Sequence, residues 1–97
     1  MFDIQKGNGG EVLLSGRLDA AQVDRVRDEM KAVQGSCVVD FANLDYISSA
    51  GMGVLLGVQK RLSDAGHSLT LVNMNRHIRE IFRIAGFDNV FRIEETT

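Results

Sequence analysis

Two adjacent serines, Ser48 and Ser49, stand just before Gly51 and Gly53 and an apolar run with helical spacing. The first N–H groups of a helix lack partners within it, and the helix dipole favours anions at that end. One serine could simply cap the helix, which stabilises it by about 1 kcal/mol. Alternatively, one could receive a phosphate of about −1.5 to −2 charges where a partner docks. The spacing alone leaves both interpretations open.

Other chemistry at this glycine-rich stretch is disfavoured by spacing. A phosphate-binding loop needs Gly-Lys-Ser/Thr at its end, but Gly57 is followed by Val58, and the dinucleotide pattern fails because its third glycine falls one place late. No Gly-x-Ser-x-Gly elbow is present. His67 and His77 lack the spacing of metal ligands, which predicts two surface histidines. We therefore expect no cofactor, no metal site and no enzymatic activity.

Asp40 suggests a rival function, an aspartyl-phosphate receiver. It ends a predicted buried strand, where open α/β sheets bind ligands. A receiver also needs an acidic pair to hold Mg²⁺, and the turn at residues 16–19 provides one carboxylate. The lysine expected after a late strand is absent. We therefore expect Asp40 to hydrogen-bond the backbone of the serine loop, with a contact to a partner as the alternative.

Composition limits the possible partners. The chain has 97 residues and a formal net charge of −2, so we expect one domain over residues 1–97 and no nucleic-acid binding, which usually requires a basic stripe. No apolar stretch approaches ~18 residues, and the N-terminus does not have the layout of a signal peptide. These features predict a cytoplasmic location, no membrane contact and a protein partner.

The pattern along the chain predicts alternating strands and helices. Residues 2–6 and 11–15 read as a hairpin, and Asp19 caps a helix that Gly35 ends, with one buried stripe (Ala20, Val23, Val26, Met30, Val33). Residues 37–41 suggest a short strand covered on both faces. A second helix (about 51–65), a strand (68–73), a helix capped by Asn75 and a last strand or packed tail (87–93) follow; residues 94–97 should be frayed. The prediction is an α/β fold with a mixed, mostly parallel sheet of about four to five strands, about three helices and an N-terminal hairpin.

Gly57 lies in the middle of the second predicted helix. Glycine there costs about 0.5 to 1 kcal/mol relative to alanine, so a compensating reason is expected. Close approach to the sheet or to a neighbouring helix is the simpler explanation. The alternative is a flat seat for a partner.

Three motifs carry a resemblance to a known family: Ser-Gly-Arg-Leu-Asp-Ala at residues 15–20, the Ser-x-Gly-x-Gly helix start at 49–53, and the late Gly-Phe at 86–87. In their order and separations they resemble the STAS family, in particular the bacterial anti-sigma factor antagonists. The resemblance extends from about Phe2 to Ile93. It implies a single STAS domain with the STAS fold.

The resemblance also implies a mechanism. In similar proteins, a serine kinase that is also the anti-sigma factor phosphorylates the serine two places before the first glycine, which is Ser49 here, with Ser48 as the alternative acceptor. The unphosphorylated protein binds the kinase and releases the sigma factor, and a PP2C-type phosphatase restores this form. The resemblance assigns partner binding to a turn and to the helix start (Leu18, Asp19, Ser48, Ser49, Ala50, Gly51, Met52, Gly53). We expect a monomer or weak dimer.

A second function is compatible with the same resemblance. Some STAS proteins are free-standing adapter subunits of transport or signalling assemblies, and their phosphorylation is not regulated. The residues at 48–57 do not separate this function from partner switching.

Overall fold

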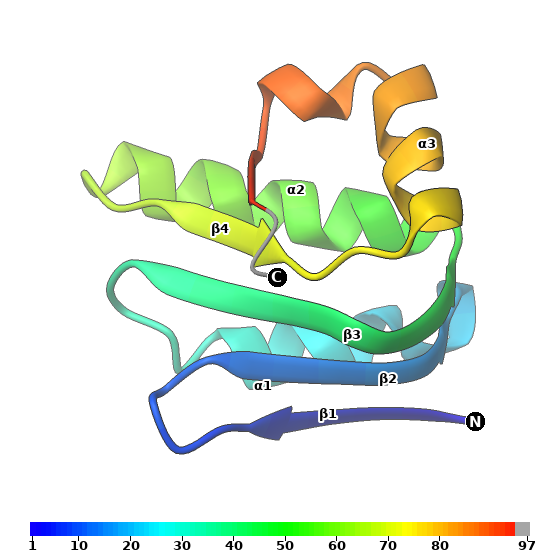
Figure 1. Ribbon diagram of the computed structural model, residues 1–97. Helices are drawn as coiled ribbons and strands as arrows, with labels where there is room; N and C mark the ends of the chain where they lie inside the picture. Colours follow the sequence, from blue (N-terminus) through cyan, green and yellow to red (C-terminus); the bar gives the residue numbers. More distant parts are fainter. Residues whose placement is uncertain (95–97) are drawn as a thin grey trace.

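The computed structural model describes residues 1–94 and contains five strands and three α-helices in that range: β1 (Phe2–Lys6), β2 (Val12–Leu18), α1 (Val23–Met30), β3 (Cys37–Ile47), α2 (Ser49–Asp64), β4 (Leu69–Val72), α3 (Arg76–Ile84) and β5 (Arg92–Glu94). The sheet order is β1-β2-β3-β4-β5, with β1 antiparallel to β2 and the other neighbours parallel (Figure 1). The predicted mixed sheet with an N-terminal hairpin is confirmed. Of the tail expected to be frayed, Glu94 belongs to β5, and residues 95–97 lie outside the described range.

The helices cover one face of the sheet. In Figure 1, α1 and α2 lie behind the strands. The contact between Phe82 of α3 and Phe41 of β3, whose rings meet edge-on with centroids 6.1 Å apart, shows that α3 packs on the same face. On the opposite face, Leu13 and Val38 keep 36% and 40% of their surface exposed. The prediction that residues 37–41 are covered on both faces is therefore wrong. Side chains alternate along a strand, and only one of the two sets meets helices.

β3 has 11 residues, many more than the five predicted, and it is irregular. Its register with β2 shifts between Asp40 and Asn43 and again at Asp45, which lies between the paired positions Leu44 and Tyr46. An extra residue in one strand reverses which later side chains face the core. Simple alternation from buried Leu44 would bury Tyr46; with the shift at Asp45, Ile47 is buried instead. The bulge thus determines which side chains surround the strand end.

α1 is shorter than predicted. Asp19 caps the 3-10 turn Ala20–Gln22 that precedes it, and α1 ends at Met30, not near Gly35. The Arg61 guanidinium donates to the carbonyl oxygens of Met30 and Val33 at 2.8 and 3.0 Å. A side chain from α2 thereby satisfies carbonyls that a longer helix would have bonded internally. In the predicted stripe, Val26, Met30 and Val33 are buried, Val23 is partly buried and Ala20 is exposed.

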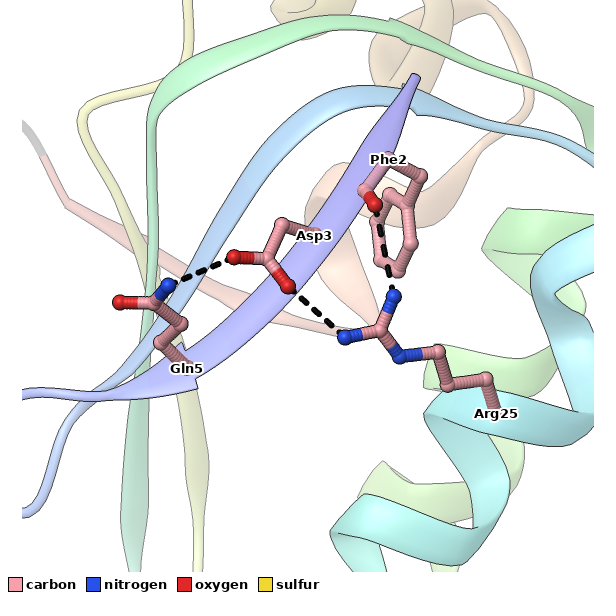
Figure 2. Close-up of polar contacts among 4 residues, drawn as sticks. All are labelled: Phe2, Asp3, Gln5 and Arg25. Atoms are coloured by element: carbon pink, nitrogen blue, oxygen red, sulfur yellow. Dashed lines mark hydrogen bonds and ion pairs between the residues drawn. The ribbon is translucent and has the colours of Figure 1, made fainter.

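The edge strand β1 is tied to α1 by Arg25 (Figure 2). The guanidinium donates to Asp3 Oδ1 at 2.7 Å and to the carbonyl oxygen of Phe2 at 3.4 Å. Gln5 donates to the other Asp3 oxygen at 2.6 Å. These hydrogen bonds, first that from Arg25 and then that from Gln5, hold the pKa of Asp3 below its usual range. The side chain of a helix thus covers part of an otherwise open sheet edge, which limits pairing with other chains.

Candidate functional site at the start of α2

Ser48 is the N-cap of α2. Its backbone is extended, and its Oγ accepts a hydrogen bond from the N–H of Gly51 at 3.1 Å. Its own N–H donates to the carbonyl oxygen of Leu18 at 2.9 Å. The hydroxyl and the backbone of Ser48 are therefore both engaged, and α2 begins at Ser49, two residues earlier than predicted.

Ser49 is the first residue of α2 and is exposed. Its hydroxyl has no hydrogen-bond partner among residues 1–94. It stands where the helix dipole is most favourable to an anion. The structure thus separates two serines that the sequence could not distinguish: Ser48 holds the helix start, and Ser49 presents a free hydroxyl to solvent.

The turn at Leu18 and Asp19 lies against this helix start. Besides the hydrogen bond from Ser48 to Leu18, a Cβ on Gly51 would come within 2.9 Å of side-chain carbons of Leu18 and Ile47. Only glycine permits this close packing. Asp19 accepts from the N–H of Ala21 at 3.0 Å, and the Gln22 side chain accepts from the N–H of Asp19 at 2.8 Å, forming a capping box. Two helix starts therefore lie side by side.

Some of the residues predicted to contact a partner are exposed, and the others are buried beneath them. Ser49, Ala50 and Gly53 are exposed, and Ser48 and Asp19 are partly exposed. Leu18, Gly51 and Met52 are buried beneath this surface, and their contact with a partner stays a prediction. Their packing holds the exposed residues in place.

Asp40 does not support the serine loop, and that prediction is wrong. Its Oδ1 accepts from the N–H of Ala42 at 2.8 Å, and both carboxylate oxygens lie 3.2 Å from Nδ2 of Asn73. The carboxylate therefore holds the first bulge of β3 and the residue after β4. β3 continues for seven residues beyond Asp40, so this side chain lies well short of the strand end that leads to Ser48.

Gly57 of α2 also differs from the simpler expectation. A Cβ built on Gly53 or Gly57 would have no neighbour within 4 Å, and both residues are exposed. Close approach to the sheet or to a neighbouring helix therefore does not explain Gly57. Of the two explanations considered, the flat seat for a partner fits the observed exposure.

Arg17 and Tyr46 adjoin the site, and sequence reasoning did not identify them. They are paired across β2 and β3, and the guanidinium carbon of Arg17 lies 4.2 Å from the centroid of the Tyr46 ring. A sequence-based prediction that the strand ending at Leu18 pairs in parallel with the strand ending before Ser48 would have placed Arg17 close to Tyr46. The two side chains lie on the same face of the sheet only because of the bulge at Asp45, and the sequence has no clear signal for that bulge.

The described residues offer neither a metal-binding cluster nor a membrane-spanning helix. Within residues 1–94, no three His, Cys, Asp or Glu side chains are grouped so that they could hold a metal ion. No helix in that range is long and apolar enough to cross a membrane. The free thiol of Cys37 is buried, and burial raises its pKa, which disfavours the reactive thiolate.

Comparison with known proteins agrees with the fold. The family described as "Mlab, STAS domain" matches residues 2–94. BtrV of Bordetella bronchiseptica, named among the anti-sigma factor antagonists, is 36% identical over 84 residues, which cover 82% of this chain and 72% of BtrV. The anti-sigma F factor antagonist of Paenibacillus polymyxa is 31% identical over 87 residues, 84% of this chain and 74% of that one.

A solved structure shows the same architecture. The Bacillus cell fate determinant SpoIIAA in its phosphorylated form superposes with a TM-score of 0.73 and 20% identity, covering 100% of this chain and 92% of SpoIIAA. At this identity the likeness establishes the fold. The family match over nearly the whole chain carries the assignment, and the chain belongs to the STAS domain family.

Proposed function

We propose that this chain is an anti-sigma factor antagonist that acts as a phosphorylation-regulated partner switch. With Ser49 unphosphorylated, the exposed surface around the start of α2 binds an anti-sigma factor or switch-protein serine kinase with a histidine-kinase-like ATPase fold. Phosphorylation of Ser49 releases the kinase, and a PP2C-type phosphatase restores binding. The observation that carries the proposal is the free, exposed hydroxyl of Ser49 beside a serine that already caps the helix.

A phosphate on Ser49 is compatible with the fold of the protein itself. Negative charge in the first turn of a helix is stabilised by the dipole and by unpaired N–H groups. Ser48, not Ser49, makes the capping hydrogen bond, so modification of Ser49 leaves the cap intact. The switch therefore acts on docking and leaves the fold intact.

The same phosphate opposes docking. About two negative charges would have to be desolvated against the partner and close to the partly exposed carboxylate of Asp19. An unfavourable term of a few kcal/mol corresponds to about 10² to 10³ in affinity. This difference is large enough to exchange one partner for another.

The proposal describes a binding module and not an enzyme. We place it in the cytoplasm, as a monomer or weak dimer, without nucleic-acid or membrane contacts. Relatives named anti-sigma-B and anti-sigma F factor antagonists support the general role. The structural neighbour SpoIIAA has been solved in a phosphorylated form, which supports modification as the means of control.

The test is a phosphorylation and binding assay with purified proteins. A histidine-kinase-like ATPase from the same cells is incubated with this chain and ATP, the modified residue is mapped by mass spectrometry, and affinity is measured before and after. Ser49→Ala should bind constitutively and Ser49→Asp should bind about 10²-fold more weakly. Ser63→Ala, which changes an exposed serine near the other end of α2, is the matched control. Phosphate found on Ser48, or unchanged affinity in Ser49→Asp, would contradict the proposal.

A second candidate function is a free-standing adapter subunit of a transport or signalling assembly. One observation favours it: the matching family model is described with the name Mlab. An adapter would use the same exposed surface without modification of Ser49. Absence of phosphate from Ser49 under all growth conditions, together with co-purification of transporter subunits, would favour this function over the switch.

A further inference from the structure

We propose that Arg17, stacked on Tyr46, is a specificity-determining contact that receives a carboxylate of the protein partner. This inference rests on the proposed function and adds to it a recognition element outside the serine loop. The pair lies on the sheet, not on α2. Its role would be to recognise the partner by charge, independently of whether Ser49 is modified.

The position of the pair follows from the strand register. Arg17 pairs with Tyr46, and the next pair is Leu18 with Ile47. Leu18 and Ile47 are buried in the core, so alternation directs Arg17 and Tyr46 to the opposite, open face. Only Ile47 separates Tyr46 from Ser48 along the chain. On β2, Arg17 directly precedes Leu18, whose carbonyl oxygen accepts the hydrogen bond from the N–H of Ser48. A partner that covers Ser49 and extends around this end of the sheet to its open face would meet Arg17.

The stack prepares Arg17 for binding. With its guanidinium 4.2 Å from the ring centroid, the side chain is held by a cation–π contact. The guanidinium makes no hydrogen bond within residues 1–94, so its N–H groups stay available for a planar, bidentate carboxylate. An arginine held in one conformation loses less entropy on binding than a free one. Arginine and tyrosine are also the residue types enriched in binding hot spots.

The charge of Arg17 is uncompensated within the protein. Arg17 is exposed and forms no ion pair with any residue of the described range 1–94. Four other arginines in that range are paired with carboxylates (Arg25 with Asp3, Arg27 with Asp24, Arg83 with Glu80, Arg92 with Glu94), and Arg61 donates to backbone carbonyls. Arg76, at the start of α3, forms no ion pair with any residue of the described range either, but it has no aromatic ring beside it. The acidic neighbours Asp19 and Asp45 make no ion pair with Arg17. A guanidinium that contacts an aromatic ring but has no counter-ion within the protein is suited to bind an acidic side chain of the partner.

The test measures affinity for the purified kinase that phosphorylates Ser49 in the assay above. Arg17→Gln should weaken binding of the unphosphorylated protein about 30-fold, and Arg17→Lys about 10-fold because lysine lacks the planar fork. Tyr46→Leu should weaken binding less, and its effect should not add to that of Arg17→Gln. Binding of Arg17→Gln should also depend less on salt concentration than binding of the wild type. Arg92→Gln, an exposed strand arginine already paired with Glu94, is the matched control.

The outcomes separate this inference from the proposed function. If the Arg17 variants bind within about twofold of the wild type while Ser49→Asp still loses affinity, the Arg17 contact is refuted and the switch stands. If the variants change only the phosphorylated form, Arg17 serves the phosphate and not a partner carboxylate. If the wild type binds no such kinase, both proposals fail. Far-UV circular dichroism of each variant excludes loss of fold as the cause.

Discussion

Replacing each serine in turn should separate the structural role from the regulatory one. Ser48→Ala removes the acceptor that lies 3.1 Å from the N–H of Gly51. Loss of an N-cap serine costs about 0.5 to 2 kcal/mol, typically about 1. In a domain of this size, 1 kcal/mol corresponds to about 4–8 °C in Tm. We therefore expect Ser48→Ala to unfold several degrees below the wild type.

The same measurement on Ser49 should give a different result. Because the Ser49 hydroxyl is exposed and has no partner among residues 1–94, Ser49→Ala should change the free energy of unfolding by less than about 0.5 kcal/mol. Ser49→Asp should stabilise the protein by about 0.3–1 kcal/mol at low ionic strength, since its charge meets the positive end of the helix dipole. This gain should shrink as salt is added.

Urea denaturation followed by far-UV circular dichroism is a suitable assay, because the chain contains no tryptophan for fluorescence and α2 is the longest of the described helices. All variants should keep the wild-type m-value, so that midpoint shifts report stability alone. Equal destabilisation by Ser48→Ala and Ser49→Ala would refute the division of roles between the two serines. So would phosphorylation of Ser49→Ala at Ser48 with wild-type efficiency.

Three further predictions concern the packing of α2 and the edge strand β1. Gly51→Ala should destabilise the protein by about 1–3 kcal/mol in urea titrations, because the new Cβ would lie within 2.9 Å of Leu18 and Ile47. Gly57→Ala should stabilise it by about 0.5–1 kcal/mol, since the added methyl meets nothing within 4 Å; a loss of stability would show that the position is packed. Asp3→Asn should lower the urea midpoint near neutral pH. Because the pKa of Asp3 is lower in the folded than in the unfolded protein, its stabilisation exists above the unfolded pKa and is lost as pH falls through the folded value, so the two midpoints should converge in acid.

Local signals in the sequence were reliable where a feature depends on neighbours along the chain. The caps at Asp19 and Asn75 bond N–H groups two and three residues ahead of them, and both were predicted. The hairpin and the succession of strands and helices along the chain follow from alternation, turn residues and helical spacing. The lengths of β3 and α1 were less predictable. The carbonyl oxygen at the end of α1 is hydrogen-bonded by Arg61, a residue of α2. In β3, bulges interrupt the alternation of buried and exposed residues, but the strand continues beyond them.

Contacts between distant segments decided the rest of the candidate site. Asp40 bonds Asn73, 33 residues away, and not the serine loop that the sequence suggested, because β4 lies beside β3 in the sheet. Arg17 meets Tyr46 only because β2 and β3 pair in a register shifted by the bulge at Asp45. Neither contact has a local signature that a single sequence displays.

By itself, the sequence determined that this protein has an α/β fold and that a serine-glycine motif opens its middle helix, because caps, turns and periodicity are chemistry between near neighbours. Only the tertiary structure decided that Ser48 is bound to Gly51 and anchored to Leu18, whereas Ser49 faces solvent. The physical reason is that either serine can cap an isolated helix. The choice is made by a hydrogen bond between two segments far apart in the sequence, once β2 and β3 have paired.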